Sequence, residues 1–193
     1  MINTIPLAEF PQGHLLTDFI TKEKITLSDH LWIAGGFVRK CLFGEQRWCD
    51  VDIFGPRFST LRSLLSNQGY ALEYKKYNVT YTKGNDVIQG INLYYPTIQA
   101  CLESFDFTIC QFGFDGTNIY TGPTTIRDYA DRLLVINKIT KPLSTLRRLK
   151  KYRQQGFQMD LRSILKINKS VMSMHSNEVI ADYMSGGTSF SYF

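Results

Sequence analysis

The stretch from Leu31 to Phe54 constrains the fold of this chain more than any other. Its letters, LWIAGGFVRKCLFGEQRWCDVDIF, predict an apolar strand, a Gly-Gly turn, a short helix and a second strand. The glycine pair, Gly35 and Gly36, leads into the helix, and the first N–H groups of a helix have no partner within it, so they can bind an anion. The second strand carries Asp50 and Asp52, whose side chains leave the same face because they are two residues apart.

Two carboxylates on one strand face can converge on a divalent cation. Mg²⁺ is commonly held by one or two carboxylates together with substrate phosphates. Asp50 and Asp52 are therefore candidate ligands of Mg²⁺ or Mn²⁺. An Asp-x-Asp pair also occurs on solvated strand ends, but here Val51 and Ile53 predict a buried strand. Carboxylates there would be unfavourable without a cation or hydrogen bonds.

Composition and charge limit the classes of protein to which this chain can belong. The net charge of +5 and the pI of about 9.0 suit a polyanionic partner. No run of 18 apolar residues occurs, so we expect no membrane span and a cytoplasmic location. The cysteines lack zinc-finger or C-x-x-C spacing, which predicts reduced thiols in an intracellular protein. They are Cys41, Cys49, Cys101 and Cys110.

Along the whole chain, helical and strand patterns alternate. We expect an α/β (α+β) core with a small mixed or antiparallel sheet flanked by helices over residues 1–140, and a basic helical region over 141–193. We expect the tail after residue 184 to be mobile or to form an oligomer contact. Predicted helices are 12–21, 37–43, 59–69, 97–105, 124–130, 142–156, 161–174 and 178–184. Predicted strands are 31–34, 50–54, 74–83, 87–95 and 107–114, with a short apolar segment at 133–136.

The central motif resembles a known signature. Gly35-Gly36-Phe37-Val38-Arg39 followed by Asp50-Val51-Asp52 is similar to the DNA polymerase β-like nucleotidyltransferase superfamily, and within it to the head of bacterial-type tRNA CCA-adding enzymes and poly(A) polymerases. The segment 106–111 with 114–116 resembles that family's R-R-D-F-T-I-N-A segment and acidic turn, and 145–160 resembles its R-x-x-R-x-x-R-F helix. The resemblance covers residues 31–160.

The resemblance implies a Mg²⁺-dependent transfer of a nucleoside monophosphate from an NTP, such as ATP, to a hydroxyl group. The acceptor it implies first is an RNA 3′ end, tRNA in particular. A protein side chain or a small molecule is an alternative acceptor, because the chain has little room for domains that measure a tRNA. A non-catalytic module of the same fold that binds RNA or a partner is a further alternative.

The resemblance assigns site residues, and the sequence departs from it at two places: one removes arginine contacts expected for the incoming nucleotide, and the other leaves the third carboxylate open. Ser104 and Phe105 replace the family's Arg-Arg pair, and the segment around Gln89 has no acid where relatives often carry one. Asp106 is the candidate third carboxylate, as metal ligand or general base, or else it caps a local turn. Arg39 either binds a phosphate or braces the fold through an acidic partner.

A basic cluster lies on the predicted helix 142–156. It either contacts RNA or the triphosphate, or forms a solvated helix face. The cluster comprises Arg147, Arg148, Lys150, Lys151 and Arg153.

Overall fold

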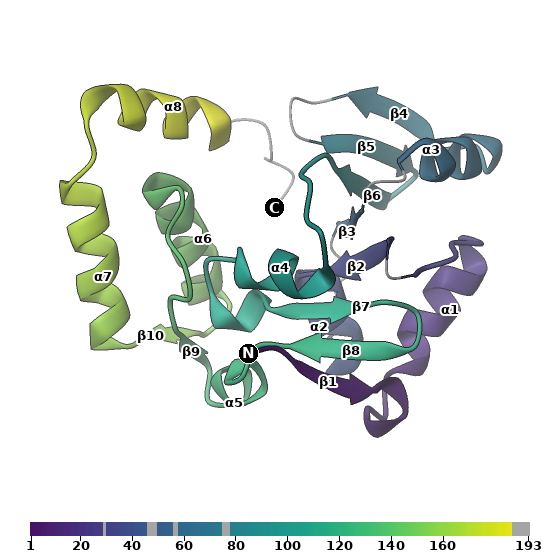
Figure 1. Ribbon diagram of the computed structural model, residues 1–193, viewed down its shortest axis with the longest axis horizontal. Helices are drawn as coiled ribbons and strands as arrows, with labels where there is room; N and C mark the ends of the chain where they lie inside the picture. Colours follow the sequence, from purple (N-terminus) through teal and green to yellow (C-terminus); the bar gives the residue numbers. More distant parts are fainter. Residues whose placement is uncertain (29, 46–49, 56–57, 75–77, 187–193) are drawn as a thin grey trace. The chain divides into compact units, whose positions relative to one another are not determined.

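The two strands of the central motif lie side by side within an eight-stranded mixed sheet (Figure 1). The computed structural model describes residues 1–28, 30–45, 50–55, 58–74 and 78–186, with the backbone alone for 58–60 and 183–186. The order of the strands is β1-β8-β7-β2-β3-β6-β5-β4. These strands are β1 (Asn3–Pro6), β2 (Trp32–Ala34), β3 (Val51–Phe54), β4 (Ala71–Tyr74), β5 (Asn78–Lys83), β6 (Asp86–Ile91), β7 (Phe112–Phe114) and β8 (Asn118–Thr121).

At strand β3 the pairing of the sheet changes from antiparallel to parallel. It pairs antiparallel with β2 on one side and parallel with β6 on the other. Its residues alternate: Val51 and Ile53 are buried, whereas Asp52 between them is partly exposed. The apolar residues therefore fix the register of β3, because a slip by one residue would bury Asp52 in their place.

The neighbouring strands continue this division into two faces. The apolar face carries Ile88 of β6 and Tyr81 of β5, which lie opposite each other and are each 1% exposed. On the other face, the register aligns four polar residues across four strands. In strand order they are Asp52 (β3), Gln89 (β6), Thr80 (β5) and Glu73 (β4).

Helices accompany the sheet and supply much of its core. Phe19 on α1 packs against Phe37 on α2, with ring centroids 4.8 Å apart. Leu61 and Leu65 on α3 are buried at 1% and 0% exposure, as their helical spacing predicts. These helices are η1 (Leu7–Glu9), α1 (His14–Lys22), α2 (Gly36–Leu42), α3 (Phe58–Asn67) and α4 (Ile98–Glu103).

The chain divides into two compact units. The first comprises Met1–Glu103 and Cys110–Pro123, and the second comprises Ser104–Ile109 and Thr124–Phe193. The second unit takes in the segment around Asp106 and resumes at Thr124, and the functional boundary expected between residues 140 and 141 stays a prediction.

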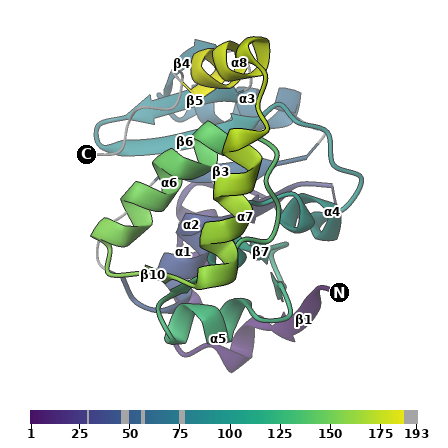
Figure 2. The ribbon, with the colours of Figure 1, turned by 90° about the vertical axis from the view of Figure 1, so that its left-hand side faces the viewer.

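The second unit is built from helices around an aromatic core. Tyr152 lies edge-on to both Phe107 and Phe157, with ring centroids 5.6 and 6.2 Å apart. Helices α6 and α7 run side by side (Figure 2). The carboxylate of Asp182 caps α6 by accepting hydrogen bonds from the backbone N–H of Leu143 and the hydroxyl of Ser144. The elements are η2 (Thr108–Cys110), α5 (Thr125–Ala130), β9 (Leu133–Leu134), α6 (Pro142–Gln154), β10 (Gln158–Met159), α7 (Leu161–Met172) and α8 (Ser176–Gly186). Residues 109 and 110 of η2 belong to different units.

The predicted fold class is confirmed, and one predicted strand is wrong in part. A strand was expected over 107–114, but only Phe112–Phe114 is a strand, and Thr108–Cys110 forms the single turn η2. The reason is that the backbone N–H of Thr108 bonds to the carbonyl of Val135 in the second unit, which takes this segment out of the main sheet.

Three of the four cysteines lie within the described residues. Cys41, Cys101 and Cys110 are buried free thiols, while Cys49 lies outside the described residues. Of the tail after residue 184, residues 187–193 lie outside them too. Over the part of the chain that the structure describes, no helix is both long and apolar enough to cross a membrane.

Candidate active site

The glycine turn and the two aspartates of the central motif are brought together in the first unit. Gly35 is the residue before α2 and has a φ of +94°, a backbone conformation that favours glycine. A Cβ built onto Gly35 would lie 3.9 Å from an Oδ2 atom of Asp52. The Asp52 carboxylate therefore faces the turn, and the glycine keeps the space beside that carboxylate clear. Gly36 begins α2 and contributes to its first turn.

Asp50 and Asp52 share a neighbour on β6. Asp50 comes directly before β3, is 8% exposed, and accepts a hydrogen bond on Oδ2 from Nε2 of Gln89 at 2.9 Å. Asp52 lies opposite Gln89 in the parallel register of β3 and β6. Residues that lie opposite each other on paired strands share a face of the sheet. Both carboxylates thus lie on the Gln89 side of the sheet.

These donors fit a hard divalent cation. Carboxylate oxygens are the ligands that Mg²⁺ and Mn²⁺ prefer, and Mg²⁺ is often held by only one or two of them plus phosphate oxygens. Asp50 and Asp52 supply that number beside a turn that can approach a phosphate. Among the described residues, no group of three His, Cys, Asp or Glu side chains could hold a metal ion.

A buried thiol near Asp52 is unreactive at neutral pH. Burial raises the pKa of Cys101 on α4 to about 12; a hydrogen bond with Trp32 opposes this shift, and the charge of Asp52 adds to it. The thiolate is the nucleophilic form of cysteine. Cys101 therefore contributes packing here rather than nucleophilic chemistry.

A cavity of about 490 Å³ borders Asp50 on the side of α1 and α2. Phe19 and Phe37 line it, and so does Lys22, which lies 3.1 Å from a Glu23 oxygen and 3.2 Å from an Asp86 oxygen. Hydrogen bonds to these two carboxylates raise the pKa of Lys22. Lys22 was not singled out from the sequence, because its approach to Asp86 spans 64 residues.

Arg39 is buried, which favours the bracing role over phosphate contact. Its side chain is 2% exposed, and its Nε lies 3.7 Å from an oxygen of Glu45. A guanidinium with so little exposed surface is poorly placed to receive a ligand phosphate.

Asp106 belongs to the second unit, where its carboxylate is engaged on both oxygens. Oδ2 accepts a hydrogen bond from Nε of Arg148 at 2.5 Å, and Oδ1 accepts one from the backbone N–H of Phe107 at 3.1 Å. The bond to Phe107 is of the local capping kind that the sequence left open. This arrangement favours a structural role for Asp106.

The Asp106–Arg148 pair leads to an asymmetric stability prediction. The Asp106 side chain is 10% exposed and that of Arg148 is 46% exposed. Arg148→Met would leave a buried carboxylate without its cation, and we expect a loss of about 3 kcal/mol in the free energy of unfolding. Asp106→Asn leaves a cation that can turn to water, and we expect a loss of about 1 kcal/mol. Urea unfolding of both variants checks this order, and equal losses would contradict it.

The residues of the basic cluster on α6 differ in their contacts. Arg148 pairs with Asp106, and Lys151 lies 6.0 Å from the ring centre of Tyr152. Arg153 lines an apolar cavity of about 500 Å³ between α6 and α7, together with Leu149 and Ile167. Lys150 is exposed and Arg147 is half-buried.

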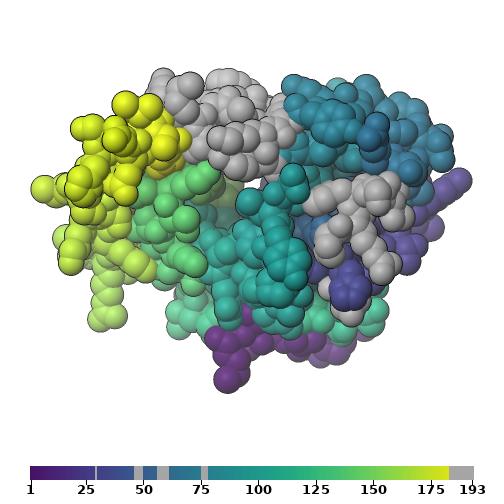
Figure 3. Space-filling model, turned by 45° about the horizontal axis from the view of Figure 1, so that its top comes forward, coloured from purple at the N-terminus to yellow at the C-terminus, as the bar shows by residue number. Residues whose placement is uncertain are grey.

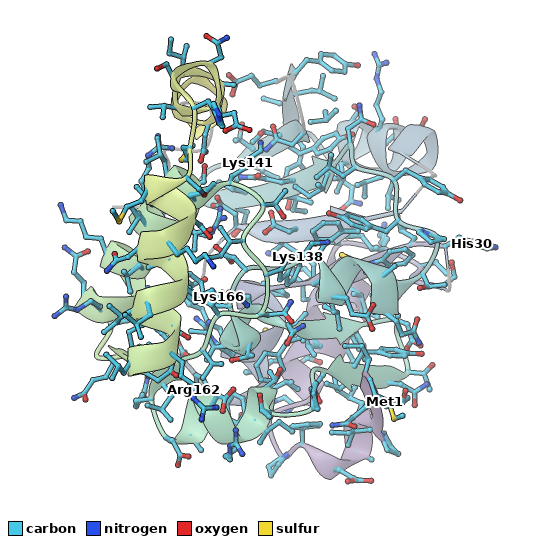
Figure 4. The ribbon with its side chains drawn as sticks, turned by 60° about the vertical axis from the view of Figure 1, so that its left-hand side comes forward. Met1, His30, Lys138, Lys141, Arg162 and Lys166 are labelled. Carbon is cyan, nitrogen blue, oxygen red and sulfur yellow. The ribbon has the colours of Figure 1, made fainter. Side chains whose placement is uncertain are left out.

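A second group of cations lies beside α7 and was missed from the sequence. Nζ of Lys166 donates hydrogen bonds to the carbonyls of Ile136 and Asn137, at 3.4 and 3.1 Å, which sets α7 against the loop before α6. Figure 4 shows the exposed cations of that loop and of α7 on one side of the second unit, and Figure 3 shows α7 side chains standing out into solvent. We call this group the α7 basic face; it comprises Lys138, Lys141, Arg162 and Lys166.

Charge is divided unevenly between the two units. The second unit carries 12 Lys and Arg residues against 6 Asp and Glu residues, a net charge of +6. The first carries 10 against 11, a net charge of −1. The whole basic excess of the chain therefore lies in the second unit.

Solved structures of tRNA-processing nucleotidyltransferases share this fold. The chain is similar to a CCA-adding enzyme in complex with CTP (TM-score 0.67, 15% identity), covering 88% of this chain and 46% of that one. It is similar to the Thermotoga maritima CCA-adding enzyme complexed with tRNA-CCA (0.64, 17%; 88% and 46%). A tRNA nucleotidyltransferase with a primer tRNA and an incoming ATP analogue is also similar (0.61, 18%; 86% and 54%). The chain thus has a nucleotidyltransferase-type fold and spans about half the length of these structures.

Comparison by sequence adds the family. No curated protein matches the chain. A family model described as "Gad2: Gabija anti-defense 2 family protein" matches residues 9–132. Because this match covers more than half of the 193 residues, the chain belongs to the Gabija anti-defense 2 family.

Proposed function

We propose that the chain is a nucleotidyltransferase that moves a nucleoside monophosphate from an NTP to a hydroxyl acceptor. The observation that carries this proposal is the position of the Asp52 carboxylate beside the Gly35 turn, with Asp50 on the same side of the sheet. A phosphate-binding turn next to two carboxylates is the arrangement that metal-assisted phosphoryl chemistry needs.

In this proposal each part of the site has a separate task. The triphosphate lies against the backbone of the Gly35-Gly36 turn and accepts a hydrogen bond from the N–H of Gly36, since the N–H of Gly35 already donates to the carbonyl of Phe112 at 2.8 Å. Asp50 and Asp52 hold Mg²⁺ or Mn²⁺, which when bound offsets the negative charge that develops on the phosphates. The acceptor oxygen forms a bond to the α-phosphorus, the bond to the β-phosphate oxygen breaks, pyrophosphate leaves, and the hydroxyl proton is released.

We place the acceptor among RNA molecules. The second unit, with a net charge of +6, can neutralise backbone phosphates, and the α7 basic face gives it exposed cations on two segments. Two of the similar structures are named as complexes with tRNA. A protein acceptor remains the second candidate, since the name of the family states an anti-defence role against Gabija, and modifying a component of that system would serve such a role.

The proposal is tested by following label from α-³²P NTPs. The purified chain is incubated with Mg²⁺ and each NTP in turn, with total RNA or with extract from cells that carry Gabija. We expect the label to appear in RNA and to be released by ribonuclease. Unlabelled pyrophosphate should form in the same reaction. Label that resists ribonuclease and is removed by protease would replace the RNA acceptor by a protein one. No label in any fraction, with any NTP, would overturn the transferase proposal.

A further inference from the structure

Three polar side chains form a hydrogen-bonded chain that ends at Asp50. Nδ2 of Asn78 on β5 donates to Oε1 of Gln89 at 2.7 Å, and Nε2 of Gln89 on β6 donates to Oδ2 of Asp50 at 2.9 Å. Gln89 is 7% exposed and Asp50 is 8% exposed. The Gln89–Asp50 bond is therefore shielded from water, where hydrogen bonds fix geometry most strongly, whereas the Asn78–Gln89 bond is partly buried.

Chemistry allows only one direction for this chain when Asp50 is ionised. A carboxylate has no proton to donate, so Gln89 must present its NH₂ group to Asp50. The carbonyl oxygen of Gln89 then faces Asn78, and Asn78 must donate to it. Asp50 thus fixes which end of the Gln89 amide faces it, and Asn78 stabilises that orientation by donating to the other end.

Gln89 lies on β6, which is the strand between β3 and β5. It lies opposite Asp52 on β3 and opposite Thr80 on β5. The segment 88–92 contains no acid. The side chain on β6 that faces the aspartates is the neutral amide of Gln89. It donates a hydrogen bond to Asp50, so the site has two carboxylates and one neutral donor.

We infer that Gln89 is a positioning residue for Asp50, and that Asn78 holds the Gln89 amide in the orientation that Asp50 requires. This inference rests on the proposed metal-binding role of Asp50. Side chains that hydrogen-bond to a metal ligand orient it and commonly change metal affinity by about 10- to 100-fold. Gln89 acts in this way without touching the metal or the substrate.

The test measures Mn²⁺ binding rather than turnover. Mn²⁺ alone is titrated into the full chain and followed by electron paramagnetic resonance. We expect Gln89→Leu to weaken Mn²⁺ affinity by about 10-fold. Asn78→Asp should have a similar effect, because an aspartate draws the NH₂ group of Gln89 to itself and turns the carbonyl oxygen toward Asp50.

A double-mutant cycle separates this orientation from charge and folding. In the Gln89→Leu background, Asn78→Asp should cause no further loss of Mn²⁺ affinity, because the amide it acts through is gone. Gln111→Leu is the matched control: Gln111 is also buried, and it donates to the carbonyl of Leu102 at 3.0 Å. It should lower the melting temperature and leave Mn²⁺ affinity unchanged.

The outcomes distinguish this inference from the proposed function. If Asp50→Asn weakens Mn²⁺ binding and Gln89→Leu does not, the positioning role is wrong and the metal site stands. If Gln89→Leu and Asn78→Asp lower Mn²⁺ affinity additively, Asn78 does not act through Gln89. If the unmodified chain binds no Mn²⁺, the metal site and the positioning role both fail.

Discussion

Replacing Asp52 by asparagine lowers nucleotide transfer on the order of 1,000-fold, and Asp50→Asn has an effect of the same order. Asparagine keeps the size of the side chain but removes the charge that binds a divalent cation. Folding should not suffer from Asp52→Asn, because the substitution removes repulsion between two carboxylates on one side of the sheet. Initial rates of label transfer and a urea unfolding curve measure the two effects separately.

An exposed aspartate provides the control for this pair. Asp131 lies in the second unit on the surface, and Asp131→Asn should leave both transfer and stability unchanged. Transfer by the Asp50→Ala/Asp52→Ala double variant at the rate of the unmodified chain would show that these aspartates do not serve the reaction.

Replacing Gly55 by alanine destabilises the chain by more than about 3 kcal/mol, because strain and a steric clash act together. Gly55 directly follows β3 and has a φ of +136°. A Cβ at this position would lie 2.1 Å from the carbonyl oxygen of His30 and 3.1 Å from Cα of Leu31. Both are backbone atoms, so the end of β3 or the start of β2 would have to move.

Gly84 gives a matched comparison for Gly55. It has a φ of +58°, and an added Cβ would meet nothing within 4 Å. The Gly84→Ala variant should therefore lose only about 1 kcal/mol in the free energy of unfolding, because alanine is strained in a left-handed backbone. Thermal unfolding of the two variants measures the difference, and equal melting temperatures would show that the close approach at Gly55 is relieved without loss.

Local patterns were enough to predict the centre of the fold. The glycine turn and the alternation of Val51, Asp52 and Ile53 are short-range signals, and the structure has the strands and helix they indicate. Strand β1 was missed because its partner β8 lies more than 110 residues later in the sequence. Strand β8, which pairs with both β1 and β7, was missed too. The segment 107–111 was misassigned because a run of buried residues is compatible with either a strand or a turn.

The parts of the site that the sequence could not predict depend on distant pairings. Gln89 meets Asp50 only through the register of β3 and β6. Arg148, which pairs with Asp106, lies 42 residues later in the sequence. The residues next to Asp106 therefore do not predict this pair. The α7 basic face combines a loop with a helix, so its cations are neighbours only after folding. The sequence could name the chemistry of the site but not the side chains that orient it.

Crystals of the chain soaked with Mn²⁺ and a non-hydrolysable NTP analogue test the proposed site most directly. We expect an anomalous Mn²⁺ peak bonded to the carboxylates of Asp50 and Asp52, at about 2.1 to 2.2 Å, with phosphate oxygens completing its coordination. The triphosphate should lie against the backbone of Gly35 and Gly36. A nucleotide bound elsewhere, or Mn²⁺ that contacts neither aspartate, would contradict the nucleotidyltransferase site proposed for this chain.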